Sequence, residues 1–221
     1  MWDLIARTPA FHQEAKGVKI LGVHVSPMVI GSVAKPVATL DDFKGLRLRT
    51  NGKSTALLAE RMGATVMTVP GPDIFMNLQK KIVEATVAAW EGHRGFGLVN
   101  ICNFFTESDF LPPIYFYLVI NENKWNSLPP DLQKVMEDAS GARFAALGGE
   151  TEASISEEMR KSLQVEGKAV LNFSASDREK IDKVCAEVRE EELSRMEKEG
   201  VPDARRYVAE FLELMKQYET R

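Results

Sequence analysis

The sequence predicts an α/β fold, and residues 46–89 give the main support. Leu46–Thr50 alternates apolar and polar residues, while Ala64–Val69 and Val83–Ala89 are rich in small and β-branched residues, with helical stretches between the three. This strand-helix-strand-helix-strand order is typical of a parallel sheet with crossover helices. The chain has 221 residues, 44% of them hydrophobic, so it is long enough for one large domain or two small lobes.

The residues before this region predict a helix followed by extended segments. Residues 2–15 are expected to form a helix that is interrupted at Pro9. Val18–Val25 is a short apolar run rich in β-branched residues, which indicates a buried strand. Ser26–Ala38 contains two prolines and a glycine, so we expect a second extended segment with bends. Thr39–Asp42 predicts a capped helical turn.

Helices are expected between and after the parallel strands. Ser54–Gly63 begins after an Asn-Gly turn, and Pro72–Lys81 is entered through Gly-Pro-Asp. Tyr115–Ile120 is aromatic and β-branched and predicts a further strand. Asn123–Leu128 and Pro129–Arg143 have helical patterns, and proline is tolerated near a helix start.

The last third of the sequence is mainly helical. Arg143–Arg160 keeps a helical pattern with a moderate apolar stripe, and Gly148-Gly149 weakens the expectation that this helix is unbroken. Ala169–Phe173 predicts a strand. Ser176 is expected to cap a long charged helix that runs to Glu199, with a solvated face and apolar residues at helical spacing. Pro202–Tyr218 predicts a terminal helix.

Composition excludes several classes of protein. The 28 basic and 32 acidic residues are mixed along the chain, without the basic stripe that a nucleic-acid partner requires. No run approaches the ~20 apolar residues of a membrane span, and the first residues do not resemble a signal peptide. Cys102 and Cys185 are expected to be buried thiols, since no histidine flanks them at metal-ligand spacing.

Motifs for catalysis, metals and cofactors are absent from the sequence. There is no glycine-rich dinucleotide or phosphate loop and no Gly-x-Ser-x-Gly. His93 beside Glu91 could form an acid-base couple, but a lone pair on a loop is more often structural. We therefore expect no catalytic residue, no metal site and no cofactor.

Two residues are candidates for ligand binding because they end predicted parallel strands. Ligands bind at the carboxyl edge of such sheets. Arg49 there can hold a carboxylate through two parallel hydrogen bonds, and the large ring of Trp90 can wall a pocket. The alternatives are a surface salt bridge for Arg49 and core packing for Trp90.

Several segments in order resemble the solute-binding proteins of TRAP transporters. The segments are Pro36–Asn51 (PVATLDDFKGLRLRTN), Leu58–Val69 (LAERMGATVMTV), Asp73–Val83, Ala89-Trp90-Glu91 and Tyr115–Ser140. Together these segments cover most of the chain, and their occurrence in this order is far more specific for the family than any single segment.

The resemblance implies a two-lobed periplasmic-binding-protein-like fold with a hinge and an incomplete first lobe. Residues 1–26 and 115–155 would form the remainder of lobe one, and 27–114 and 156–221 would form lobe two. The family begins with a signal peptide and a further part of lobe one. This sequence contains neither, so we expect a truncated reading frame, a fragment or a divergent relative. An exposed apolar face is expected where the missing strands would pack.

The resemblance also implies a function and a site. A small carboxylate would be captured in the periplasm for membrane permease subunits, by a protein that is not an enzyme. Arg49 falls at the family's carboxylate-binding arginine, with Trp90, Glu91 and Val87 as further ligand-binding candidates.

Some positions depart from the family pattern. Glu84-Ala85 replaces Asp-Gly, and Ala89 replaces a proline. Val29, Val87 and Ala88 stand where other branches carry polar contacts. A carboxylate less polar than a sugar acid fits these changes better. A non-binding remnant and a small-acid hydrolase are the alternative functions.

Overall fold

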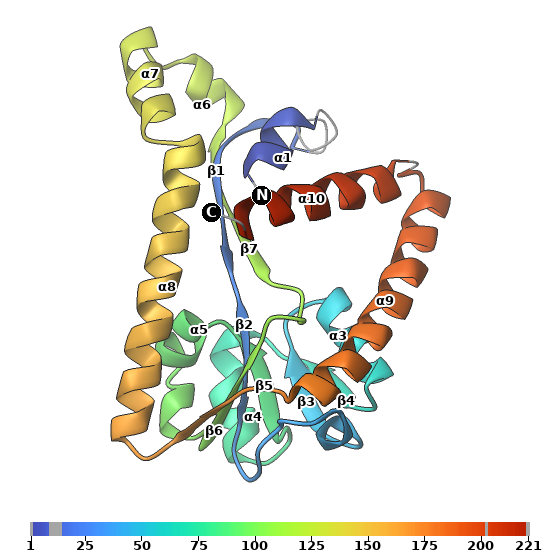
Figure 1. Cartoon of the computed structure of the whole chain (residues 1–221). Coiled ribbons are helices and arrows are strands. Elements are labelled where there is room, and N and C mark those ends of the chain that lie inside the picture. The colour runs from blue at the N-terminus through green and yellow to red at the C-terminus, as the bar shows by residue number, and fades with distance from the viewer. Residues whose placement is uncertain (1, 9–14, 202, 220–221) are drawn as a thin grey trace. The chain divides into compact units, whose positions relative to one another are not determined.

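The computed structural model describes residues 2–8, 15–201 and 203–219 (Figure 1). The chain divides into two compact units, which are described separately. Unit 1 comprises Met1–Val25, Tyr115–Glu152 and Glu192–Arg221, and unit 2 comprises Ser26–Ile114 and Ala153–Glu191. The long helices α8 (Gly141–Val165) and α9 (Ala175–Lys198) therefore contribute residues to both units.

Unit 1 is built on a two-stranded sheet of β1 (Val18–Ser26) and β7 (Ile114–Asn121). Its helices, besides parts of α8 and α9, are α1 (Trp2–Arg7), α6 (Glu122–Asn126), α7 (Pro130–Asp138) and α10 (Ala204–Glu219). The first turns of α8 pack closely on β1, because a Cβ on Gly148 would lie 2.4 Å from the His24 Cβ.

Unit 2 contains a six-stranded sheet in the order β4-β3-β5-β2-β6-β8. Its strands are β2 (Met28–Ser32), β3 (Arg47–Thr50), β4 (Thr65–Thr68), β5 (Ala85–Ala88), β6 (Phe104–Ser108) and β8 (Ala169–Leu171). β3 is parallel to β4 and β5, and β6 is parallel to β8. β2 is antiparallel to both β5 and β6. The other five strands therefore all run in one direction.

Helices cover both faces of this sheet (Figure 1). One face packs against α3 (Lys53–Arg61) and the unit 2 part of α9. The other packs against α4 (Ile74–Gln79), α5 (Trp90–Gly95) and the unit 2 part of α8. Short 3₁₀ turns complete the unit: η1 (Leu40–Phe43), η2 (Gly71–Asp73) and η3 (Leu98–Asn100).

The expected parallel arrangement is confirmed. β3, α3, β4, α4 and β5 follow one another as predicted, and the β4–β5 connection crosses β3. The strands predicted around Val18–Val25, Tyr115–Ile120 and Ala169–Phe173 are present as β1, β7 and β8. The first helix is described as Trp2–Arg7, and the expectation for residues 9–14 lies outside the described residues.

The helix expected over Arg143–Arg160 is confirmed within α8, which runs unbroken through Gly148-Gly149. The missing side chain of Gly148 permits a close approach to β1. One local prediction was wrong. The cap of α9 is Ser174 and not Ser176: the Ser174 hydroxyl accepts a hydrogen bond from the Asp177 backbone N–H, 3.2 Å away. The elements between Trp90 and Ser108 had no prediction at all.

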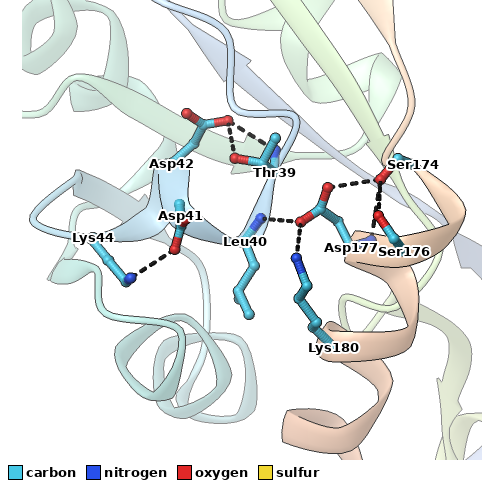
Figure 2. A network of polar contacts seen from close by, with 9 residues as sticks. All are labelled: Thr39, Leu40, Asp41, Asp42, Lys44, Ser174, Ser176, Asp177 and Lys180. Atoms are coloured by element: carbon cyan, nitrogen blue, oxygen red, sulfur yellow. Dashed lines mark hydrogen bonds and ion pairs between the residues drawn. The ribbon is translucent and has the colours of Figure 1, made fainter.

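The cap of α9 is joined to the turn η1 by hydrogen bonds, as Figure 2 shows. The Asp177 carboxylate accepts from the Ser174 hydroxyl at 2.7 Å and from the Leu40 backbone N–H at 3.5 Å. On the other side, the Asp42 carboxylate accepts from the backbone N–H and the hydroxyl of Thr39, both at 2.8 Å. The N–H groups of Thr39 and Leu40 at the start of η1 are thus satisfied by acidic side chains, whereas the Asp177 N–H in α9 is satisfied by the Ser174 hydroxyl.

The units differ from the expected lobes mainly at the C-terminus. The stretch Glu192–Arg221 belongs to unit 1, whereas the sequence grouped it with lobe two. The correspondence between these units and ligand-binding lobes stays a proposal.

Candidate functional site

The strand directions define one edge of the unit 2 sheet as the candidate site. Five strands present their carboxyl ends there, and the antiparallel β2 presents its amino end. Arg49, Trp90 and Ser108 lie at or just after the ends of β3, β5 and β6. Loops at the carboxyl edge of an α/β sheet are where such folds place ligands.

Register places several candidate side chains on the same face of the sheet. Arg49 pairs with Thr86, and Ala88, two residues further along β5, pairs with Val29. Val29 in turn pairs with Glu107. Because paired residues share a face and the side-chain period is two, these residues form a row across the sheet.

Arg49 is a buried cation, only 7% exposed. Its Nε donates to the Val69 carbonyl oxygen at 2.8 Å, and its Nη1 donates to the Val87 carbonyl oxygen at 3.1 Å. No carboxylate of the described residues forms an ion pair with it. Burial lowers the pKa of the guanidinium, but an arginine remains charged in proteins. Its charge is thus oriented by main-chain carbonyls and is not neutralised.

Arg47 differs sharply although it belongs to the same strand. Its side chain is 47% exposed and lies 3.5 Å from Glu84. Its Nε and Nη2 donate to the Ile82 and Lys81 carbonyl oxygens. The surface salt bridge that was the alternative interpretation of Arg49 is therefore formed by Arg47.

Trp90 is the first residue of α5 and is 1% exposed. Its ring contacts those of His93 and Phe105, with centroids 5.9 and 5.6 Å away. The indole N–H donates to Glu107 Oε1 at 3.3 Å. Both interpretations of Trp90 therefore apply, since it packs in a core cluster and also lines a cavity.

That cavity lies at the carboxyl edge and measures about 410 Å³, within the usual range for small-molecule sites. Its lining residues lie at or beside strand ends, at the start of α5, and on α8 and α9: Pro27, Met28, Val29, Trp90, Glu107, Ser108, Asp109, Ser156, Arg160, Asn172, Phe173 and Arg178. Arg49 is not among them. It lies on β3, two strands away from β2, or about 10 Å at ordinary strand spacing.

The remaining predicted site residues occupy different environments. The Val87 side chain is fully buried in the opposite core, and its carbonyl group contacts Arg49. Glu91 lies in the first turn of α5, and its Oε2 is buried without a hydrogen-bond partner among the described residues. Such an unpaired buried oxygen requires an explanation.

Of three further residues near the site, the sequence had suggested a role only for His93, as part of an acid-base couple with Glu91. His93 is fully buried, its Nε2 lies 3.1 Å from the Val29 carbonyl oxygen, and burial lowers its pKa to about 4. Arg160 of α8 holds Glu107 of β6 through Nε at 2.9 and 3.1 Å. Glu107 and Arg160 are 53 positions apart, so no local pattern could have paired them.

Metal and membrane features can be assessed over the part of the chain that the structure describes. Within it, no cluster of three His, Cys, Asp or Glu side chains is placed to hold a metal ion. None of the described helices combines the length and apolarity needed to cross a bilayer.

Curated relatives match parts of the chain at moderate identity. A monocarboxylate 2-oxoacid-binding periplasmic protein of Nostoc sp. is 24% identical over 169 residues, 75% of this chain and 45% of the relative. An uncharacterized protein of Haemophilus influenzae is 27% identical over 130 residues, 58% of this chain and 39% of the relative. The matched part thus spans less than half of each relative.

Solved structures match the fold over nearly the whole chain. A TRAP periplasmic solute-binding protein from Bordetella bronchiseptica with bound mandelate is 24% identical, with a TM-score of 0.85, covering 98% of this chain and 69% of that one. A marine metagenome TRAP solute-binding protein specific for aromatic acid ligands is 21% identical, with a TM-score of 0.90 and the same coverage. At these identities the likeness shows the fold.

The family profile described as bacterial extracellular solute-binding protein, family 7, matches residues 9–195. The match covers most of the chain, including every strand of the unit 2 sheet and the loops at its carboxyl edge. It confirms the resemblance that the ordered sequence segments indicated. The chain belongs to the bacterial extracellular solute-binding protein family 7.

Proposed function

We propose that this chain is part of the solute-binding component of a TRAP transporter. It captures a small organic acid in the periplasm and delivers it to membrane permease subunits. Family membership and the two-lobed relatives support this role. The ligands bound in the related structures are carboxylates, including mandelate, benzoate and malonate.

The observation that carries the proposal is the buried, unneutralised charge of Arg49. Two of its five N–H donors are used by main-chain carbonyls, which leaves others for a ligand. A carboxylate there would form charge-assisted hydrogen bonds and compensate the buried charge.

The other candidate residues have distinct roles in this proposal. Trp90 packs against the body of the ligand at the cavity wall. The unpartnered Glu91 oxygen accepts a hydrogen bond from a ligand hydroxyl or a water molecule. Val87 acts through its carbonyl oxygen, which holds the Arg49 guanidinium in place.

A thermal-shift screen tests the proposal on the 221-residue chain. A ligand at a hundred times its Kd stabilises by about 2.7 kcal/mol, or a rise in Tm of about 5–10 °C for a protein of this size. Mandelate, benzoate, pyruvate and malonate form the first panel. A folded chain with no shift for any carboxylate would identify a non-binding remnant, and turnover of a small acid ester would favour a hydrolase.

A further inference from the structure

The charged side chains of the cavity are paired with one another. The two arginines of the lining, Arg160 and Arg178, form ion pairs with the two acids of the lining, Glu107 and Asp109. Arg160 and Arg178 come from α8 and α9, whereas Glu107 and Asp109 come from β6 and the residue after it. The cavity wall is therefore polar but carries no formal net charge.

The Glu107–Arg160 pair is well oriented. Arg160 Nε lies 2.9 and 3.1 Å from the two Glu107 oxygens, and Nη2 lies 2.8 Å from Oε1. The Trp90 indole N–H donates to the same Oε1. The cavity wall thus presents a guanidinium that donates hydrogen bonds next to a carboxylate that accepts them.

This neutral wall contrasts with Arg49, whose charge no described residue neutralises. One carboxylate on the ligand therefore has a counter-charge in unit 2. A second carboxylate at the cavity would be desolvated next to charges that are already compensated, which is unfavourable. A hydroxyl group can donate to Glu107 and accept from Arg160, and it brings no charge.

We propose that the Glu107–Arg160 pair determines specificity, so that the ligand is a monocarboxylate with a neutral hydrogen-bonding group, such as a hydroxyl, at its far end. This inference rests on the proposed carboxylate-binding function. Phe173 and Trp90 line the same cavity, so the part of the ligand that lies in this cavity is apolar or aromatic apart from its hydrogen-bonding group.

Calorimetric titration with three acids of one shape tests the preference. The probes are phenylacetate, 3-hydroxyphenylacetate and 3-carboxyphenylacetate. The wild type should bind the hydroxylated acid about tenfold more tightly than phenylacetate, and the dicarboxylate most weakly. If all three bind equally, or the dicarboxylate binds best, the specificity inference is overturned while the proposed function stands. If none of the three binds while an acid of the thermal-shift panel does, the specificity inference is overturned and the proposed function stands; if no acid of either set binds, the proposed function fails.

Removing one acid should reverse the discrimination. Glu107→Gln keeps an acceptor for Trp90 and Arg160 but leaves the cavity with one positive charge. We expect the affinity for 3-carboxyphenylacetate to rise about tenfold relative to that for phenylacetate. Glu158→Gln is the matched control, because it removes the same charge from α8 at the exposed Arg94–Glu158 pair, outside the cavity.

A second variant keeps the inference testable if Glu107→Gln does not fold. Asp109 is largely exposed, so Asp109→Asn should fold and should shift the preference in the same direction. If a folded Glu107→Gln variant shows no gain for the dicarboxylate, or Glu158→Gln shows an equal gain, the assignment is wrong. It is also wrong if Glu107→Gln does not fold and Asp109→Asn shows no gain.

Discussion

Arg49 and His93 are two ionisable residues buried in unit 2, and burial affects their charges differently. Desolvation lowers the pKa of both. Arginine starts so high that it stays charged, whereas His93 falls to a pKa of about 4 and is neutral at pH 7. A fixed cation and a neutral ring thus lie close together, and the nearby Arg49 charge itself helps to lower the pKa of His93.

Arg49→Lys should weaken carboxylate binding by more than tenfold. Lysine is a point charge that cannot keep the bonds to Val69 and Val87 while it offers a planar fork to the ligand, and loss of a buried charged hydrogen bond costs about 2–5 kcal/mol. Arg47→Ala, at the exposed end of the same strand, should bind as the wild type does. Calorimetric titration of both variants measures these affinities. Equal affinity of Arg49→Lys and the wild type would show that Arg49 does not hold the carboxylate.

His93 should make stability depend on pH in the acid range. The folded-state pKa of about 4 lies below the ordinary value near 6.5, so between these pH values the unfolded chain binds a proton that the folded protein excludes. Stability from this residue is complete above pH 6.5 and falls as the pH falls, by about 3 kcal/mol in total. When the free energy of unfolding is measured with urea from pH 7.5 to 4.5, its decrease with falling pH should be smaller for His93→Gln than for the wild type. An equal decrease in both proteins would refute this prediction.

At the scale of elements, the two adjacent glycines of α8 have opposite roles. A Cβ on Gly148 would lie 2.4 Å from His24 Cβ, whereas one on Gly149 would meet nothing within 4 Å. Gly149→Ala should therefore stabilise unit 1 by about 0.5–1 kcal/mol through helix propensity. Gly148→Ala should destabilise it by about 1–3 kcal/mol through overpacking. Urea denaturation of the two variants checks this, and equal effects would contradict it.

The two serines before and in the first turn of α9 provide a similar comparison. Ser174 accepts the Asp177 N–H and also donates to its carboxylate, so Ser174→Ala should cost about 1 kcal/mol of stability. The Ser176 hydroxyl contacts the Ser174 hydroxyl and does not cap the helix, and Ser176→Ala should change stability by less than about 0.5 kcal/mol. Chemical denaturation measures both. A larger loss for Ser176→Ala would restore the assignment made from sequence.

At the scale of the whole molecule, unit 1 exposes an apolar strand. Four consecutive residues of β7, Phe116, Tyr117, Leu118 and Val119, are each more than a third exposed, and among the described residues the sheet pairs β7 with β1 alone. Two-stranded sheets are marginal alone, and apolar edges promote association. Because successive side chains alternate along a strand, β7 exposes apolar side chains on both of its faces.

The 221-residue chain should consequently associate as its concentration rises. Val119→Lys should reduce this association, because a charge on an edge strand opposes strand pairing. Val165→Lys makes the same chemical change on α8, at a position that is 89% exposed, and should leave the association unaltered. Sedimentation velocity at several concentrations compares the wild type with the two variants. A monodisperse wild-type monomer at every concentration would disprove this.

Local sequence patterns were sufficient for the parallel β3–β4–β5 part of the sheet and for the edge position of Arg49. Alternation, helical spacing and turn residues act within a few positions of one another. The ordered segments also pointed to the family that the profile match then showed.

Tertiary structure alone decided the rest, because it depends on residues distant in the sequence. β2 is inserted antiparallel between β5 and β6, and this placement brings Val29 beside Glu107. The Glu107–Arg160 pair joins residues 53 positions apart, and the close approach of β1 to α8 falls at Gly148, where a side chain would collide with His24. Sequence patterns record which residues favour a helix or a strand, but the partner that satisfies a buried charge or fills a gap is set by packing.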